Sequence, residues 1–145
     1  RRLKVEVYGD NWPVDKFFYK NVRIPNKDLP DYYATSLVTL NVGRRFNLAN
    51  NKYQLDPSTP GPRTFEAAMA GAVQCFFLEG LEIEDYFKFG EEILVFDSPK
   101  ELATIIEDLK SNNKYRDIIA KNSQLRALKD HTYACRAQKI LEKVL

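Results

Sequence analysis

The chain has 145 residues, a formal net charge of +2 at pH 7 and 44% hydrophobic residues, which are the size and composition of one soluble domain. So small a net charge argues against nucleic acid as a partner, since proteins that bind it carry dense Lys and Arg patches. No apolar run approaches the ~20 residues that span a bilayer, and no signal-peptide pattern opens the chain. We therefore expect a cytoplasmic protein with a single domain over residues 1–145.

Segments typical of strands alternate with segments typical of helices along most of the chain. This alternation predicts a parallel sheet covered by helices on both faces, which is an α/β fold. The expected strands are residues 3–8, 22–24, 37–40, 73–77 and 92–96. The helices expected among them are residues 14–19, 29–34, 63–70 and 81–87.

Two polar segments in this pattern are expected near a ligand. Gly9-Asp10-Asn11 follows the first expected strand, at the carboxyl edge where parallel sheets bind ligands. Residues 41–63 are long, polar and without clear periodicity, which is typical of functional or mobile loops. This loop either contacts a polar ligand or is disordered.

The C-terminal part of the chain is expected to be helical. Ser98, Pro99 and Glu101 form a capping box with proline at the first helical position. Apolar residues then recur at helical spacing in three stripes, which are Leu102, Ile105, Ile106 and Leu109, then Tyr115, Ile118, Ile119 and Leu125, and finally Ala137, Ile140, Leu141 and Val144. We expect all three stripes to face the core.

Residues that bind metals or form disulfides are sparse. His131 is the one histidine of the sequence, which excludes a site with several histidines, and no zinc or calcium spacing occurs. Cys75 lies in an apolar segment and Cys135 in a late helix, so we expect buried or half-buried thiols. Neither a metal nor an organic cofactor is expected.

The strongest candidate site is the start of the helix expected at residues 63–70. Pro60-Gly61-Pro62 must turn, and the free N–H groups and positive dipole of a helix beginning near Arg63 and Thr64 suit a phosphate. The Arg63 guanidinium adds a fixed charge for a diphosphate. Gly61 allows close backbone approach. Glu66 lies one turn further on, where a carboxylate can accept two hydrogen bonds from a ribose diol.

An ordinary loop, helix and strand would produce the same segment. In that alternative, Glu66 is a solvated surface residue and Arg63 is its partner at the i,i+3 spacing. The residues of this segment alone do not decide between the two interpretations.

Several segments in a fixed order carry a resemblance to a known family. They are residues 5–12, residues 33–41, residues 63–67 with Gly71-Ala72, residues 87–92, and His131-Thr132-Tyr133 with Arg136. The series resembles the C-terminal, donor-binding half of glycosyltransferases built from two Rossmann-like domains. These are enzymes of the GT-B type within the glycosyl transferases of group 1, and the nearest match is the CgeB-like group.

This resemblance implies a Rossmann-like parallel sheet flanked by helices, with a C-terminal helical segment. It implies a nucleotide-diphosphate sugar as donor substrate, no metal, and a missing N-terminal half that supplies the acceptor site. Arg63 and Glu66 are then the catalytic pair, and Gly61, Pro62, Arg63, Thr64 and Glu66 bind the donor. The base of the donor nucleotide is expected to bind at Arg23, Ile24 and Pro25. The alternative for these three residues is a plain strand end. Many relatives carry a second Glu eight positions before Glu66, where this chain has Ser58.

Other candidates for chemistry have simpler interpretations. Trp12 is expected to anchor a loop beside Asp10, and His131 to serve as a helix cap or polar core contact rather than a general base. Glu91 and Glu92 are adjacent in sequence, so they are poorly arranged to share a substrate. A non-catalytic binding or assembly module of the same fold remains an alternative function. A dehydrogenase or methyltransferase is disfavoured because no Gly-x-Gly-x-x-Gly follows the first expected strand.

Overall fold

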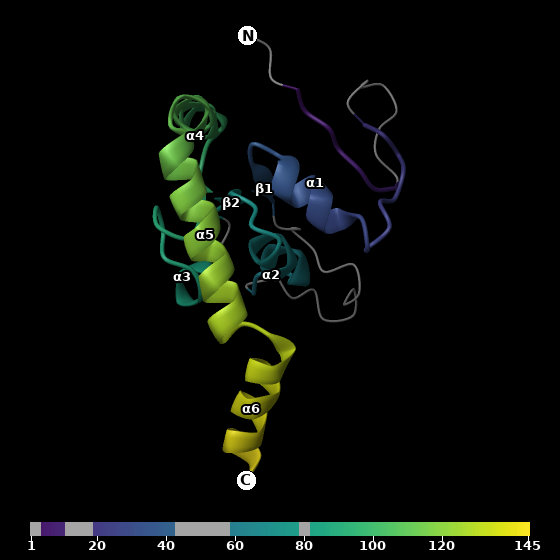
Figure 1. Ribbon diagram of the computed structural model, residues 1–145, viewed down its shortest axis with the longest axis vertical. Coiled ribbons are helices and arrows are strands. Elements are labelled where there is room, and N and C mark those ends of the chain that lie inside the picture. Colours follow the sequence, from purple (N-terminus) through teal and green to yellow (C-terminus); the bar gives the residue numbers. More distant parts are fainter. Residues whose placement is uncertain (1–3, 11–18, 43–58, 79–81) are drawn as a thin grey trace.

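Three parallel strands form the sheet at the centre of the fold (Figure 1). The computed structural model describes residues 4–10, 19–42, 59–78 and 82–145. Within them, β1 (Thr39–Asn41), β2 (Gln74–Phe77) and β3 (Leu94–Phe96) lie in the order β1-β2-β3. Leu40 lies opposite Cys75, and Phe76 lies opposite Val95. The α/β class with a parallel, Rossmann-like sheet flanked by helices is confirmed.

The helices connect and extend these strands. They are α1 (Leu29–Thr35), α2 (Pro62–Met69), α3 (Ile83–Tyr86), α4 (Pro99–Ser111), α5 (Asn113–Asp130) and α6 (Tyr133–Val144). Six expected segments are confirmed with small shifts of their ends: the helices at 29–34, 63–70 and 81–87, and the strands at 37–40, 73–77 and 92–96. The C-terminal helical segment is confirmed as well.

The core consists of two clusters of buried side chains. One lies between α2, α3 and α5 and includes Phe65, Phe87 and Ala127. The other lies between the sheet, α4 and α5 and includes Cys75 and Leu109. Helix α5 therefore contributes to both clusters and joins α2 to the sheet.

The two expected N-terminal strands are wrong in the part of the chain that the structure describes. Residues 4–8 and 22–24 belong to no strand, and Val7 makes only an isolated parallel bridge with Tyr19. The backbone N–H of Gly9 also donates to Val22 O at 3.0 Å. Val5 and Val22 are 48% and 58% exposed, so this pairing lacks the packing that stabilises a pleated strand. Several expected features lie outside the described residues, namely residue 3, Asn11, Trp12, residues 14–18 of the helix expected at 14–19, and residues 43–58 with Ser58.

Helix α4 begins as its sequence predicts. The Ser98 side chain accepts a hydrogen bond from Glu101 N at 3.3 Å, and Pro99 is the first helical residue. The Glu101 carboxylate reaches back to Asp97 N at 2.8 Å, one residue before the expected position. The stripe of α4 faces the core as expected, with Ile106 and Leu109 buried.

The apolar stripes of α5 and α6 correct the expectation that all stripes are buried. Ile118 and Leu125 of α5 are 46% and 56% exposed, because α5 packs through Ile119, Ser123 and Ala127 instead. No residue of α6 is buried. Figure 1 shows the reason, since α6 extends away from the rest of the chain.

Both cysteines occur as free thiols with the expected burial, Cys75 buried and Cys135 half-buried. Burial raises the pKa of the Cys75 thiol to about 12, because the low-dielectric core disfavours the thiolate. Among the described residues, no helix combines the length and apolarity needed to cross a bilayer.

Candidate functional site

Helix α2 starts at the edge of the sheet where the strands end. It leads from β1 to the parallel strand β2, so its first turn must lie on the carboxyl side of the sheet. Gly61 is the N-cap residue with φ −67° and ψ 163°, and Pro62 is the first helical residue. That φ does not require glycine, and a Cβ on Gly61 would meet no described atom within 4 Å. Within the described part of the chain, the position of a Gly61 side chain is therefore unoccupied.

Thr64 lies beneath this turn. It is 2% exposed, and its N–H donates to Gly61 O at 3.0 Å. Its carbonyl accepts a hydrogen bond from the Gln74 side chain at 3.0 Å. In this conformation Thr64 supports the turn, and its N–H group is already bonded within the chain.

Arg63 and Glu66 point into solvent from the first two turns of α2. Arg63 Nη1 lies 3.1 Å from Glu66 Oε2, and the two side chains are 56% and 51% exposed. This is the i,i+3 pair of the alternative interpretation. An exposed pair of this kind contributes only about 0–1 kcal/mol, so a ligand can replace it at little cost.

Glu66 also lines a cavity between α1 and α2. The cavity has a volume of about 200 Å³, and its other lining residues are Asn26, Leu29, Pro30 and Tyr33. A carboxylate at one end and apolar walls along the other side suit a ligand with hydroxyl groups and a flat ring. Sequence reasoning assigned no role to these four residues. One feature of the sequence could have indicated them: the helix expected at residues 29–34 precedes a strand beside the helix that carries Glu66.

The residues expected to bind the base lie just before this cavity in the chain. Arg23 Nε donates to Asp10 Oδ2, so two candidates of the sequence meet in an exposed ion pair. Pro25 O accepts a hydrogen bond from Asp28 N at 2.9 Å. Ile24 is half-buried. Residues 23–25 do not line the cavity, whereas the next residue, Asn26, does.

A buried carboxamide ties α2 to the sheet. Gln74 is 0% exposed, and its Oε1 accepts a hydrogen bond from Asn41 Nδ2 at 2.5 Å while its Nε2 donates to Thr64 O at 3.0 Å. Both functions of the amide are satisfied, as burial requires. The end of β1 is therefore connected through Gln74 to the first turn of α2. Sequence reasoning missed this connection.

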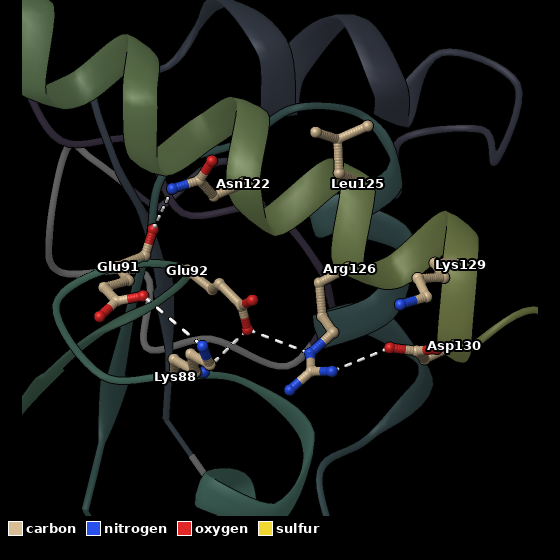
Figure 2. Close-up of a pocket in the computed structure, with 8 residues that line it drawn as sticks. All are labelled: Lys88, Glu91, Glu92, Asn122, Leu125, Arg126, Lys129 and Asp130. Carbon is tan, nitrogen blue, oxygen red and sulfur yellow. Dashed lines mark hydrogen bonds and ion pairs between the residues drawn. The ribbon is translucent and has the colours of Figure 1, made fainter.

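A second cavity lies between α5 and the turn that precedes β3, and Figure 2 shows its lining. Its volume is about 420 Å³, and it is lined by Lys88, Glu91, Glu92, Asn122, Leu125, Arg126, Lys129 and Asp130. Residues 88–92 lead into β3, which places this cavity at the amino edge of the sheet, away from the first turn of α2.

Most of the charged side chains of this second cavity are paired with one another. Glu92 Oε2 lies 3.2 Å from Arg126 Nε and accepts a hydrogen bond from Lys88 N at 2.9 Å. Arg126 Nη1 lies 2.8 Å from Asp130 Oδ2, and this hydrogen bond lowers the pKa of Asp130 and raises that of Arg126. Glu91 instead contributes its carbonyl, which accepts from Asn122 Nδ2 at 3.2 Å. Glu91 and Glu92 therefore join α5 to the turn before β3, and their arrangement does not resemble a catalytic pair.

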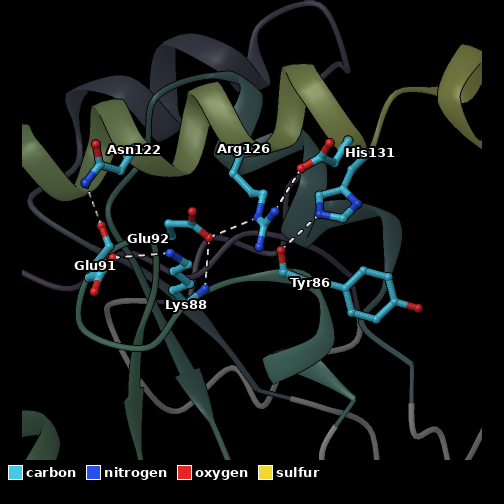
Figure 3. Close-up of polar contacts among 8 residues, drawn as sticks. Tyr86, Lys88, Glu91, Glu92, Asn122, Arg126 and His131 are labelled. Atoms are coloured by element: carbon cyan, nitrogen blue, oxygen red, sulfur yellow. Dashed lines mark hydrogen bonds and ion pairs between the residues drawn. The ribbon is translucent and has the colours of Figure 1, made fainter.

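His131 caps α5, as the favoured interpretation predicts. The backbone N–H of His131 donates to Ala127 O at 3.0 Å. Its ring atom Nε2 lies 3.0 Å from Tyr86 O, as Figure 3 shows. A carbonyl can only accept, so Nε2 carries a proton. Its ring contacts Phe65 with the centroids 5.2 Å apart. Among the described residues, no group of three or more His, Cys, Asp and Glu side chains could hold a metal ion.

The parallel sheet, the helix that begins at its carboxyl edge and the cavity beside Glu66 define an α/β domain of the Rossmann-like class. The chain belongs to the family described as Glycosyl transferase-like, whose model matches residues 1–142. A comparison with curated proteins found no match.

The fold is similar to one solved structure, described as the crystal structure of Anabaena Alr3699/HepE in complex with UDP. The two chains are 18% identical with a TM-score of 0.62, and the match covers 81% of this chain. At that identity the likeness shows the fold alone. The present chain spans 29% of the length of the Anabaena chain.

Proposed function

We propose that this chain is the donor-binding half of a metal-independent glycosyltransferase of the GT-B type, in the CgeB-like group. Joined to an N-terminal half, it transfers a sugar from a nucleotide-diphosphate sugar to an acceptor. The observation that carries this proposal is the cavity beside Glu66, one turn into a helix that begins at the carboxyl edge of a parallel sheet. Membership of the Glycosyl transferase-like family and the UDP in the Anabaena structure support it.

Glu66 binds the ribose of the donor in this proposal. Its carboxylate is half exposed and lines the cavity, so its oxygens can accept hydrogen bonds from two vicinal hydroxyls. Binding requires Arg63 to leave Glu66, which is a small loss because the pair is exposed. The guanidinium that is released lies at the helix end where the diphosphate is expected.

Arg63 stabilises the leaving group in this proposal. As the bond between the sugar and the diphosphate oxygen breaks, its electron pair and negative charge move onto the diphosphate. A guanidinium about 4 Å away in water contributes only about 1 kcal/mol. Arg63 is 56% exposed in this chain, so a larger effect requires the N-terminal half to exclude water from the site.

The base is expected in the cavity between α1 and α2. Residues 23–25 lead to Asn26, whose amide offers a donor and an acceptor to a base edge, and Leu29 and Tyr33 provide apolar wall. At Gly61, on the side where the diphosphate is expected, no described atom lies within 4 Å of the place a Cβ would occupy. The bonded N–H of Thr64 supports its turn, so a phosphate contact there requires the Gly61 hydrogen bond to open.

The N-terminal half is the expected protein partner. Tyr133, Ile140 and Val144 share one face of α6 and are 82%, 62% and 76% exposed. We propose that this face packs against the N-terminal half in a cytoplasmic enzyme. Cytoplasmic location rests on the composition of the chain, and the isolated chain is expected to be inactive.

A non-catalytic module of the same fold is the second candidate. One observation favours it, namely that Arg63 and Glu66 pair with each other and Thr64 is bonded within the chain. A domain that binds no nucleotide would show the same arrangement. Only a binding measurement separates the two.

Calorimetric titration with UDP, GDP, ADP, CDP and dTDP tests the proposal. We expect one nucleotide to bind the chain, and Glu66→Ala to weaken that binding about tenfold or more. Glu84→Ala is the matched control, because Glu84 is an exposed carboxylate on α3 that lines neither cavity described above. A folded chain that binds none of the five nucleotides would support the non-catalytic module.

A further inference from the structure

Phe65, the residue before Glu66, lies in a cage of rings and one cation. It is 5% exposed. Its ring centroid lies 5.5 Å from that of Tyr86, 5.9 Å from that of Phe87 and 5.2 Å from that of His131. The Arg136 Cζ lies 4.5 Å from the Phe65 centroid, which is a cation–π distance. Residues from α3, the junction of α5 with α6, and α6 itself therefore surround one side chain of α2.

Phe65 is the only large side chain that α2 buries. The other buried residues of this helix are Thr64, Ala67 and Ala68. Small side chains let a helix pack closely, but they leave its rotation about its own axis weakly defined. The Phe65 ring therefore helps to fix this rotation, together with the hydrogen bonds that Thr64 O and Met69 O accept from Gln74 and Gln124.

The wall of the cage at His131 is firmly held. Figure 3 shows His131 bonded to Tyr86 O, and Arg126, one turn earlier on α5, paired with Glu92. These contacts join the end of α5 to residues 86–92. Movement of the His131 ring would break its hydrogen bond to Tyr86 O.

The wall at Arg136 is held by the first turn of α6. Thr132 caps α6 through Cys135 N at 3.2 Å, and Arg136 N donates to Thr132 O at 3.0 Å. The rest of α6 contributes no buried residue. Arg136 therefore lies where the exposed helix meets the cage.

Adjacent residues of a helix point about 100° apart, so fixing Phe65 also fixes the direction of Glu66. We infer that His131 and Arg136 are positioning residues for the Glu66 site, which they orient by holding Phe65. Neither needs to touch a ligand. The inference rests on the proposed function for its binding measurement only, since the contacts with Phe65 exist without a ligand.

Arg136→Ala tests this inference on the complete chain, with Lys139→Ala as control on the exposed part of α6. A cation–π contact of about 0.5–1 kcal/mol corresponds to about a two- to fivefold change in an equilibrium constant. We expect Arg136→Ala to weaken nucleotide binding, measured with UDP, by up to about that factor, in a chain that still unfolds cooperatively at a slightly lower midpoint because the contact with Phe65 is lost. Arg136→Lys should restore part of the affinity, because it returns a cation.

Two histidine variants separate the ring from its hydrogen bond. His131→Phe keeps a ring against Phe65 and loses the bond to Tyr86 O, whereas His131→Ala loses both. We expect the affinity for UDP to fall further in His131→Ala than in His131→Phe. Equal affinities in wild type, Arg136→Ala and His131→Ala would overturn the inference, while loss of binding in Glu66→Ala alone would leave the proposed function intact.

Amide hydrogen exchange tests the inference independently if none of the five nucleotides binds, an outcome that would defeat the proposed function. In the ligand-free chain, Arg136→Ala should speed exchange in residues 64–69 and leave the amides of α4 unchanged. Lys139→Ala should change neither region. Unchanged exchange in residues 64–69, or faster exchange throughout the chain, would overturn the positioning role of Arg136.

Discussion

Two Arg–Glu ion pairs with nearly equal N–O distances lie at opposite edges of the sheet. Arg63 Nη1 lies 3.1 Å from Glu66 Oε2, and the two side chains are 56% and 51% exposed. Arg126 Nε lies 3.2 Å from Glu92 Oε2, with side chains 30% and 14% exposed. The distance alone does not distinguish a binding residue from a structural one.

Burial and the remaining partners make the difference. Glu92 also accepts from Lys88 N, and Arg126 also bonds Asp130, so the second pair has little capacity for a ligand. The first pair lies beside a cavity, and among the described residues the side chains of Arg63 and Glu66 have no such additional partner. Hydrogen bonds to charged groups contribute more to stability when they are shielded from water. We therefore expect the Arg126 pair to govern stability and the Arg63 pair to govern binding.

Replacing Phe65 should have the largest effect, because this ring packs α2 against the α5–α6 junction. Phe65→Ala leaves a cavity in the core, so we expect a loss of about 3–5 kcal/mol in the free energy of unfolding. Urea denaturation measures it. Phe89→Ala is the control, since Phe89 is 39% exposed and should change stability little. A loss below about 1 kcal/mol would contradict the packing of Phe65; if Phe65→Ala does not fold, Phe65→Leu gives the smaller loss to measure.

Removing Arg126 should destabilise the chain next most strongly. Arg126→Ala leaves Glu92 largely shielded without its cation, and we expect a loss of about 1–3 kcal/mol in the free energy of unfolding. Glu91→Ala provides the comparison, because its carboxylate is 68% exposed and makes only a long contact of 3.9 Å with Lys88. Equal losses in the two variants would remove the distinction between structural and solvated carboxylates.

Glu66→Ala should show the opposite behaviour. We expect its free energy of unfolding to change by less than about 0.5 kcal/mol, because the pair with Arg63 is exposed. Its affinity for the bound nucleotide should fall about tenfold or more, the value of one or two charged hydrogen bonds. Denaturation and calorimetry on the same preparation test both. Destabilisation equal to that of Arg126→Ala would show that Glu66 is structural.

Local signals in the sequence predicted local structure. The capping box at Ser98 and Glu101 depends on neighbouring residues only, and α4 begins where it indicates. The turn at Gly61 and Pro62 similarly determines where α2 begins. The contact between Arg63 and Glu66 is the one that the alternative interpretation took from their i,i+3 spacing. In each case, the residues that determine the structure lie within one helical turn.

Features that depend on distant partners could not be predicted. A periodic pattern shows that Ile140 and Val144 share a face of α6, but it does not show whether another element covers that face. Val5 and Val7 have the spacing of a strand without the packing that a strand needs. The Gln74 bridge and the cavity beside Glu66 join residues far apart in sequence. Residue type alone gave no sign that Asn26 and Tyr33 lie beside Glu66.

Low pH should have the smallest effect of these changes. It should weaken the ion pair between Arg126 and Asp130. The hydrogen bond from Arg126 is the largest cause that lowers the pKa of Asp130 from 3.8. A carboxyl whose pKa is lower in the folded chain than in the unfolded chain adds stability above its ordinary pKa and loses it as the pH falls through the folded value. The unfolding midpoint of wild type should therefore exceed that of Asp130→Asn at pH 6, and the two should converge below about pH 4. A constant difference between wild type and Asp130→Asn down to about pH 2 would show that the charge of Asp130 contributes nothing to its pair with Arg126.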